Sequence, residues 1–300
     1  MAIEQTAVRI ERVAILGTGL IGASVGLALR AHGFSGEISG WDPNPNELAL
    51  ALRRGAIHVA APDAVAAAKA SDVVLLGGPV FTILEWLDRL APTLKPGQLV
   101  TDVGSVKGAL VEQARGRYNL PETAGFLPGH PMAGKEVSGA ANADATLFNG
   151  AAWLFTETQE SRTMHPTSRV LADEWRGWTE KLGCRVLDLA PERHDVLCAW
   201  VSHLPQFVST ALTALLQDEF AAKDEVLPIG GRALREMTRL GASPYSMWRD
   251  VAHTNTEAIA ASLLALEQRL AHLRENLKTP ELREEFKRAN QFRPASSTRQ

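Results

Sequence analysis

Residues 12–22 have the sequence RVAILGTGLIG, in which a short apolar run leads directly into three closely spaced glycines. The apolar run predicts a buried β-strand over residues 12–17, and a helical pattern follows it. Gly17 permits a tight turn, Gly19 lets the backbone approach a pyrophosphate, and Gly22 allows the helix to pack closely on the strand. The stretch therefore predicts the strand–turn–helix unit with which a doubly wound α/β fold holds a dinucleotide.

The glycine pattern alone is a weak signal, because glycines also form ordinary turns, so its context decides the interpretation. A second predicted strand, EISGWD (37–42), ends at Asp42, 20 residues after the last glycine of the loop. A carboxylate there accepts hydrogen bonds from both adenosine ribose hydroxyls and repels a 2′-phosphate, and no arginine follows in WDPNPNE. We therefore predict NAD rather than NADP as the cofactor. The predicted contacts are Gly17, Gly19, Leu20, Ile21, Gly22 and Asp42.

Strands and helices alternate along the rest of the first half of the chain. Apolar runs predict further strands at residues 72–78, 98–104, 150–156 and 184–189. Helical patterns precede or separate them at residues 21–31, 46–55, 81–94 and 165–183. This alternation favours a parallel sheet with helices on both faces, which is a Rossmann-like doubly wound α/β fold.

The pattern changes after residue 190, where long stretches carry helical periodicity and no strand is predicted. A boundary there divides the chain into a dinucleotide-binding domain (1–190), an all-α domain (191–285) and a polar tail (286–300). The stretch AWVSHLPQFVSTALTALL (199–216) has apolar residues around most of its helical circumference. We expect this stretch to be deeply buried.

The composition favours a soluble globular protein. The chain has 300 residues, of which 45% are hydrophobic, and its formal net charge of -3 argues against binding to nucleic acid or to a membrane surface. Its two cysteines, Cys184 and Cys198, show neither a disulfide framework nor a metal-ligand spacing, so no metal site is predicted. We find no signal peptide and no apolar stretch of the ~20 residues that a membrane span needs. We expect a cytoplasmic location.

One histidine stands in a segment that is poor in helix and strand formers, FLPGHPMAGKEVSG (126–139). The glycines and prolines around His130 predict a loop after a short strand, at the sheet edge where such folds bind ligands. TDVGSVKG (101–108) has the same position after another strand and offers Ser105. Taken singly, His130 is more often a surface or structural histidine, and Ser105 is more often a helix N-cap. Two nearby lysines are expected to be solvated, Lys107 and Lys135.

Five segments taken together resemble the prephenate/arogenate dehydrogenase family: GTGLIGASVGLAL, TDVGSVKG, GHPMAGKEVSG, SHLPQ and TRLGASPYSMWRD. The resemblance runs from about residue 12 to residue 275. It implies the NAD(P)-dependent oxidation of a cyclohexadienyl alcohol with loss of the ring carboxylate as CO2, a step of tyrosine biosynthesis. It also implies a homodimer formed by an all-α C-terminal dimerisation domain, with the active site between the two domains and no metal.

The resemblance assigns roles to individual residues. His130 matches the base that accepts the hydroxyl proton, a task that suits an imidazole with a pKa near the working pH. Ser105 matches the serine that hydrogen-bonds the same hydroxyl and orients the histidine. Arg239 matches the arginine that holds the ring carboxylate. Further substrate contacts are implied at Ser202, His203, Gln206 and Trp248.

Two positions depart from the family pattern. Gln206 stands where many prephenate-using members have a second histidine, which weakens a prephenate-only assignment. Glu236, three residues before Arg239, replaces a more usual aspartate. We therefore keep arogenate or dual-specificity (cyclohexadienyl) dehydrogenase as an alternative to prephenate dehydrogenase. Tyrosine is a candidate inhibitor that would act at the catalytic pocket.

Two more distant functions stay open. A β-hydroxyacid dehydrogenase or an imine reductase has a similar architecture, but such enzymes usually rely on a lysine in the helical domain, where this chain has histidine. A nucleotide-sensing protein without catalysis would not need His130, Ser105 and Arg239 together. An assay with NAD and either prephenate or arogenate separates these functions.

Overall fold

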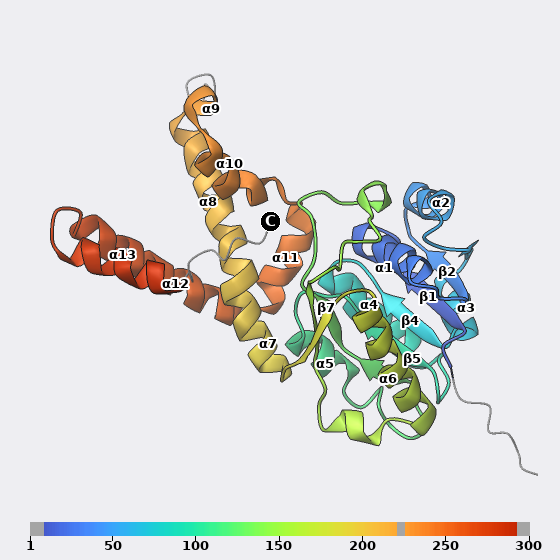
Figure 1. Cartoon of the computed structure of the whole chain (residues 1–300). Helices are drawn as coiled ribbons and strands as arrows, with labels where there is room; N and C mark the ends of the chain where they lie inside the picture. The colour runs from blue at the N-terminus through green and yellow to red at the C-terminus, as the bar shows by residue number, and fades with distance from the viewer. Residues whose placement is uncertain (1–8, 221–225, 293–300) are drawn as a thin grey trace, which may run out of the picture.

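Six parallel strands form the sheet on which the first half of the chain is built (Figure 1). The computed structural model describes residues 9–220 and 226–292. The strand order is β3–β2–β1–β4–β5–β6, so the order reverses beside β1 and the loop after β1 lies at the topological switch point. The strands are β1 (Arg12–Leu16), β2 (Glu37–Trp41), β3 (Val59–Ala60), β4 (Val73–Leu76), β5 (Leu99–Asp102) and β6 (Gly125–Leu127).

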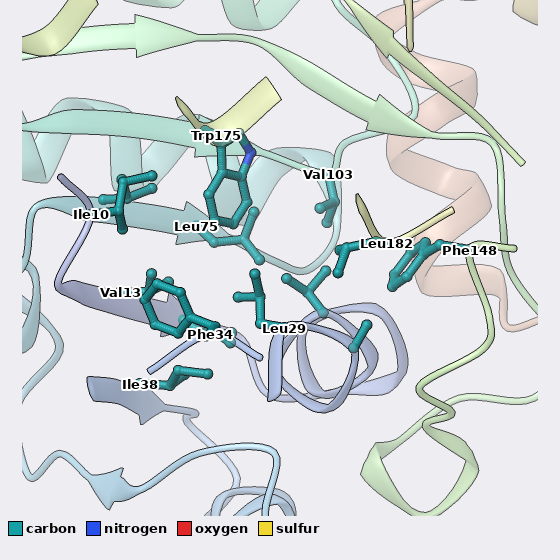
Figure 2. Packing of buried hydrophobic residues seen from close by; sticks show 14 of the residues in the cluster. Ile10, Val13, Leu29, Phe34, Ile38, Leu75, Val103, Phe148, Trp175 and Leu182 are labelled. Atoms are coloured by element: carbon teal, nitrogen blue, oxygen red, sulfur yellow. The ribbon is translucent and has the colours of Figure 1, made fainter. Parts of the chain in front are cut away.

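Helices cover both faces of this sheet, because alternate side chains of its strands pack into two separate apolar clusters. In β1, Val13 and Ile15 belong to the cluster that contains Trp175 (Figure 2), whereas Ala14 and Leu16 belong to the other. The predicted doubly wound α/β fold is therefore confirmed. The first cluster takes residues from α1 (Leu20–Ala31), α2 (Pro45–Arg53) and α6 (Pro166–Lys181), and the second from α3 (Ala64–Ala70), α4 (Val80–Leu90) and α5 (Gly108–Ala114).

A second, three-stranded sheet contains His130, which the sequence placed on a loop. The sheet has the order β7–β8–β9, with β7 (Gly129–Pro131), β8 (Ala152–Phe155) and β9 (Arg185–Asp188). β7 runs antiparallel to β8 and puts His130 opposite Leu154. The loop prediction was wrong because the ladder comes from a distant strand. Pro131 is tolerated in β7 because β7 is an edge strand.

The described part of the chain beyond residue 190 is entirely helical, as predicted. Its elements are α7 (Pro191–Cys198), a π-helical turn (Ala199–His203), α8 (Leu204–Glu219), α9 (Val226–Ile229), α10 (Arg232–Thr238), a 3-10 turn (Arg239–Ala242), α11 (Tyr245–Thr254), α12 (Thr256–Glu275) and α13 (Glu281–Phe292). Within the expected polar tail (286–300), α13 continues to Phe292, so the tail is helical as far as that residue, and residues 293–300 lie outside the described part. Of the described helices, none is long and apolar enough to cross a membrane.

The helical half extends away from the sheet (Figure 1). Many of its apolar side chains are exposed to water. The buried residues of α8 are only Gln206 and Ser209, and those of α12 are Ile259 and Ser262. Leu215 in α8 is 56% exposed. The deep burial expected for residues 199–216 is therefore not achieved within one chain, because the elements that pack on α8 cover only part of its circumference.

Candidate active site

The glycine loop after β1 has the geometry that a dinucleotide requires. Gly17 has a φ of +104°, and a Cβ on it would lie 2.4 Å from the carbonyl oxygen of Gly77 at the end of β4. A Cβ on Gly22 would lie 2.0 Å from the carbonyl oxygen of Gly17. No described atom lies within 4 Å of the place a Cβ on Gly19 would occupy, so the backbone there faces open space. Leu20 opens α1, whose N-terminus favours a negatively charged pyrophosphate.

Asp42, directly after β2, is held beside this loop. Its Oδ2 atom accepts a hydrogen bond from the backbone N–H of Thr18 (2.8 Å), and its Oδ1 atom accepts one from the backbone N–H of Asn44 (2.9 Å). A carboxylate offers about four acceptor positions, so capacity remains for ribose hydroxyls. The residues present therefore fit the adenosine and pyrophosphate parts of a dinucleotide.

A chain of three hydrogen-bonded side chains fixes His130 from the helical domain. The Nδ1 atom of His130 lies 2.9 Å from the Nε2 atom of His194, and the Nδ1 atom of His194 lies 2.8 Å from the Oδ1 atom of Asp195. The Asp195 carboxylate also accepts hydrogen bonds from the backbone N–H groups of Lys107 (2.7 Å) and Gly108 (2.8 Å). His194 and Asp195 of α7 thus connect the helical domain to the first domain through hydrogen bonds.

This chain determines where the proton on each imidazole lies. The Asp195 carboxylate accepts the Nδ1 proton of His194, so His194 Nε2 is an acceptor and His130 Nδ1 is its donor. The Nε2 atom of His130 then carries the free lone pair. Burial, followed by the nearby His194 and Lys107, lowers the pKa of His130 well below its usual range. His130 is therefore a neutral imidazole with its lone pair at Nε2, and its pKa lies below the value near the working pH that the sequence led us to expect.

Lys107, expected to be solvated, is instead completely buried and fixes the residue before His130. Its ammonium group hydrogen-bonds the carboxylate of Asp102 and the carbonyl oxygen of Gly129 (2.7 Å). Asp102 in turn accepts the backbone N–H of Gly129 (3.0 Å). The expectation was wrong because an opposite charge five residues earlier and a carbonyl group from β7 replace water around the ammonium. Lys135 lies partly exposed and bonds the carbonyl oxygen of Asn142.

Ser105 lies in the loop between β5 and α5, but it is not the N-cap that the sequence suggested. α5 begins at Gly108 with Lys107 as its N-cap, and Asp195 accepts the first N–H groups in place of a serine hydroxyl. Among the described residues, no hydrogen bond joins Ser105 to His130. The hydrogen-bond partner of His130 Nδ1 is instead His194.

His203 and Trp248 bring unpaired polar atoms to the same region. The side-chain amide of Asn255 donates to Nδ1 of His203 (3.3 Å) and to the carbonyl oxygen of Asp195 (2.9 Å), so the proton of His203 is on Nε2. Burial lowers the pKa of His203 to about 4, which keeps it neutral. Within the described part of the chain, His203 Nε2 and Trp248 Nε1 are buried without a partner, and the two rings lie 5.9 Å apart. Such donors usually indicate a bound ligand or water.

The remaining predicted substrate residues are less directly placed. Arg239 donates from Nη1 to Glu136 (2.9 Å), six residues after His130, so the arginine reaches the segment that follows the histidine. Gln206 is buried, and its amide donates to the carbonyl oxygen of Leu240 (2.7 Å) and to Thr210, while Ser243 donates to its oxygen. Gln206 therefore anchors the segment that carries Arg239. Two further positions are Ser202, in the π-helical turn, and Glu236, which pairs with Arg232.

Three residues of α7 near His130 were not predicted as site residues: His194, Asp195 and Cys198. The Sγ atom of Cys198 lies 3.5 Å from His194 Nε2 and 3.9 Å from His130 Nδ1. Burial raises the pKa of this thiol to about 12. The four-residue spacing of His194 and Cys198, which puts both on one side of a helix, was the available signal. The grouping of His130 with His194 and Cys198 could not be predicted from spacing along the chain, because His130 joins them only in the fold.

A doubly wound sheet with a dinucleotide-type glycine loop, joined to a helical domain across buried histidines, is an architecture typical of two-domain dinucleotide-dependent oxidoreductases. The chain belongs to the prephenate dehydrogenase family. Residues 25–174 match the family model described as "Prephenate dehydrogenase, nucleotide-binding domain", and residues 190–291 match "Prephenate dehydrogenase, dimerization domain".

Three similar proteins show the range of this family. The chain is 29% identical to the prephenate dehydrogenase of Bacillus subtilis over 83% of its length, and spans 65% of that protein. It is 29% identical to the cyclohexadienyl dehydrogenase of Zymomonas mobilis, over 96% of this chain and 97% of that one. Its structure is similar to that of prephenate dehydrogenase from A. aeolicus in complex with hydroxyphenyl propionate and NAD+, with a TM-score of 0.78, 29% identity and 96% coverage of both chains.

Proposed function

We propose that this protein is an NAD-dependent prephenate dehydrogenase, which oxidises and decarboxylates prephenate to 4-hydroxyphenylpyruvate in tyrosine biosynthesis. The observation that carries the proposal is the hydrogen-bonded chain from His130 through His194 to Asp195, because it leaves Nε2 of a neutral imidazole free to accept a proton. The A. aeolicus relative, solved with NAD+ and a hydroxyphenyl acid, supports both the cofactor and the type of substrate.

We propose that residues 1–190 bind NAD and that residues 191–285 bind substrate and form a homodimer. The start of α7 at Pro191 and the start of the matched dimerization domain at residue 190 support this boundary. The exposed apolar side chains of α8, α9 and α12 support a partner for the second domain, since a second copy would remove them from water.

In the proposed mechanism, His130 accepts the hydroxyl proton of the substrate at Nε2. Bound NAD supplies the acceptor for the hydride that leaves the same carbon. As His130 becomes positively charged, its Nδ1 proton stays on the hydrogen bond to His194, and the Asp195 carboxylate stabilises the new charge. The ring carboxylate then leaves as CO2, because the ring becomes aromatic.

The substrate carboxylates find their donors among residues of the helical domain. Arg239 offers a guanidinium fork, and in the absence of substrate it is paired with Glu136. The buried N–H groups of His203 and Trp248 supply two neutral donors. We propose that the ring carboxylate displaces Glu136 from Arg239, while His203 and Trp248 hold the rest of the substrate in place. Ser105 and Ser202 would complete the polar surroundings of the reacting hydroxyl.

The alternative is a dual-specificity cyclohexadienyl dehydrogenase, which also accepts arogenate. Gln206 is neutral and fully engaged with Leu240, Thr210 and Ser243, so it offers no charge that would select a keto acid over an amino acid. The Zymomonas relative supports the same alternative. Comparing kcat/KM for prephenate and arogenate, followed by NADH absorbance, decides between one substrate and two.

The central test is the variant His130→Asn. We expect kcat to fall by about 10²–10⁴-fold, which is the usual contribution of a positioned base, while NAD affinity stays unchanged. His32→Asn, at an exposed position after α1, is the matched control and should keep full activity. Retention of more than a tenth of the wild-type rate in His130→Asn would remove this residue from the mechanism.

Tyrosine inhibition, if it acts at the catalytic pocket, should be competitive with the cyclohexadienyl substrate. We propose this because the reaction product and tyrosine share a phenol ring and a three-carbon acid side chain. Tyrosine should then raise the apparent KM and leave kcat unchanged in steady-state kinetics, and a fall in kcat at saturating substrate would contradict a shared pocket.

A further inference from the structure

We propose that His130, His194 and Cys198 form a binding site for a borderline-soft divalent metal ion, zinc above all, and that metal bound there switches off the proton-accepting histidine. The three ligand atoms are His130 Nδ1, His194 Nε2 and Cys198 Sγ, which all lie within 4.8 Å of one another. All three side chains are buried, at 6%, 0% and 1% exposure respectively. Two imidazoles and one thiol are the ligand types that zinc prefers in proteins.

The distances between the ligand atoms suit a single small ion. The two nitrogens are 2.9 Å apart, and the sulfur is 3.5 Å from one nitrogen and 3.9 Å from the other. With Zn–N bonds of about 2.0 Å and a Zn–S bond of about 2.3 Å, these separations correspond to angles of about 90° to 130° at the metal. The ligands therefore occupy three corners of a distorted tetrahedron. Water would be the fourth ligand of a bound ion.

The groups around the cluster also match those that surround zinc. The Nδ1 atom of His194 donates to Asp195 (2.8 Å), which is the carboxylate–histidine arrangement that orients a ligating imidazole and raises its basicity. Asp195 is itself held by the backbone N–H groups of Lys107 and Gly108. The Lys107 ammonium, the nearby cation, is engaged with Asp102 and the carbonyl oxygen of Gly129, and so makes no hydrogen bond to the cluster.

Metal binding would change the protonation of two ligands, Cys198 and His130. The S–H bond of Cys198 breaks as the metal–sulfur bond forms, and its proton passes to the buffer, because a coordinating thiol is deprotonated. The single proton of the neutral His130 moves from Nδ1 to Nε2 as Nδ1 binds the metal. Nε2 then carries a proton and can no longer accept one from a substrate hydroxyl. This inhibitory half of the inference depends on the proposed function, whereas metal binding itself does not.

Cobalt(II) reports on the site without an activity measurement. Titration of the full-length wild-type protein with CoCl2 should produce a near-ultraviolet sulfur-to-cobalt charge-transfer band that saturates at one ion per chain. Cys198→Ser should lose this band, while Cys184→Ser, the variant of the other buried cysteine, should keep it. Asp195→Asn should weaken cobalt binding by about 10–100-fold, the usual cost of removing the carboxylate behind a ligating histidine. Absence of the band in wild-type protein overturns the site.

Zinc inhibition tests the link to the reaction, with each variant compared with its own zinc-free rate. Wild type and Cys184→Ser should be inhibited by ZnCl2 and recover on addition of EDTA, and Cys198→Ser should need at least about 100-fold more zinc, since a ligand itself is lost. Should Cys198→Ser fold poorly, judged by its NAD affinity and thermal melting, Cys198→Ala replaces it. Equal zinc sensitivity of wild type and Cys198 variants overturns the proposal. A cobalt band without zinc inhibition keeps the metal site, rejects its inhibitory role and counts against His130 as the base.

Discussion

The two halves of this molecule differ in how far their apolar side chains are buried. All four residues of β4 are completely buried, because helices pack on both faces of the sheet. In the helical half, α9, α10 and α13 bury no residue, and Ile229 and Leu264 are 84% and 54% exposed. The first half thus completes its own core, whereas the second presents apolar surface that residues 9–220 and 226–292 leave uncovered.

The contact between the two halves is well buried, like the core of the first half and unlike the exposed surface of the second. Asp195 of α7 accepts the backbone N–H groups at the start of α5, and Asp250 of α11 accepts the backbone N–H of Phe81 (3.0 Å) at the start of α4. Both carboxylates are buried, at 8% and 0% exposure. The helical domain is therefore firmly bonded to the sheet domain where the candidate active site lies, and poorly covered elsewhere.

The largest expected effect comes from this boundary. Asp195→Asn would no longer fix the proton of His194, so His130 would lose its defined tautomer. We expect kcat to fall by about 10²–10⁴-fold, as when the carboxylate of a catalytic triad is replaced by an amide, with little change in KM. Steady-state kinetics with NAD and prephenate measure both constants.

Asp218→Asn, an exposed position on α8, is the matched control and should behave as wild type. If Asp195→Asn kept kcat within twofold of wild type, the orientation of His130 would have to come from another group. A parallel rise in KM would instead indicate that the whole boundary had shifted.

The next-largest expected effect is on stability, and it compares a buried leucine of the first half with an exposed leucine of the second. Leu75→Ala in β4 leaves a cavity between the sheet and its helices and should lower the free energy of unfolding by about 2–5 kcal/mol. The same change at Leu264 in α12, studied at dilution where chains are separate, should cost less than about 0.5 kcal/mol. Urea unfolding of both variants checks the contrast. Equal losses would show that the exposed side chain is packed in the isolated chain.

A charge on the uncovered surface should separate assembly from folding. Leu264→Glu would place a carboxylate in the proposed dimer interface and should raise the dissociation constant by about 30-fold or more, equivalent to about 2 kcal/mol. Sedimentation over a range of concentrations measures this. Leu52→Glu in α2, a position 40% exposed in the first domain, should leave assembly unchanged. If both variants sediment as wild type does, the dimer must use another surface.

The same contrast explains which features the sequence could predict. β4, and β1 from Val13 onward, are continuous apolar runs, so their local pattern already indicates that both faces are buried. β7 has only three residues, two of them glycine and proline, and is a strand because β8 pairs with it from 24 residues further along. The sequence of residues 126–139 alone therefore cannot predict that pairing.

The sequence could likewise predict some features of the candidate site and not others. The glycine loop and Asp42 were recognisable because their spacing along the chain is itself the signal. The burial of Lys107 and the contact of His130 with His194 were not, because the partner groups lie on another strand or 64 residues away. Arg239 was identified only through resemblance, and its pairing with Glu136 depends on how the two domains meet.

The smallest expected effect concerns the partly exposed ion pair between Arg239 and Glu136, where the two domains meet. Glu136→Gln would release Arg239 for the substrate carboxylate without removing any buried group, since the pair is partly exposed to solvent. We expect KM for prephenate to fall by about two- to fivefold with kcat unchanged, because exposed ion pairs are weak competitors. Glu112→Gln, which disturbs an exposed pair with Arg115 in the first domain, should change neither constant. A rise in KM for Glu136→Gln would mean that Glu136 positions Arg239 for the substrate instead of competing with it, and would place Glu136 within the substrate-binding arrangement itself.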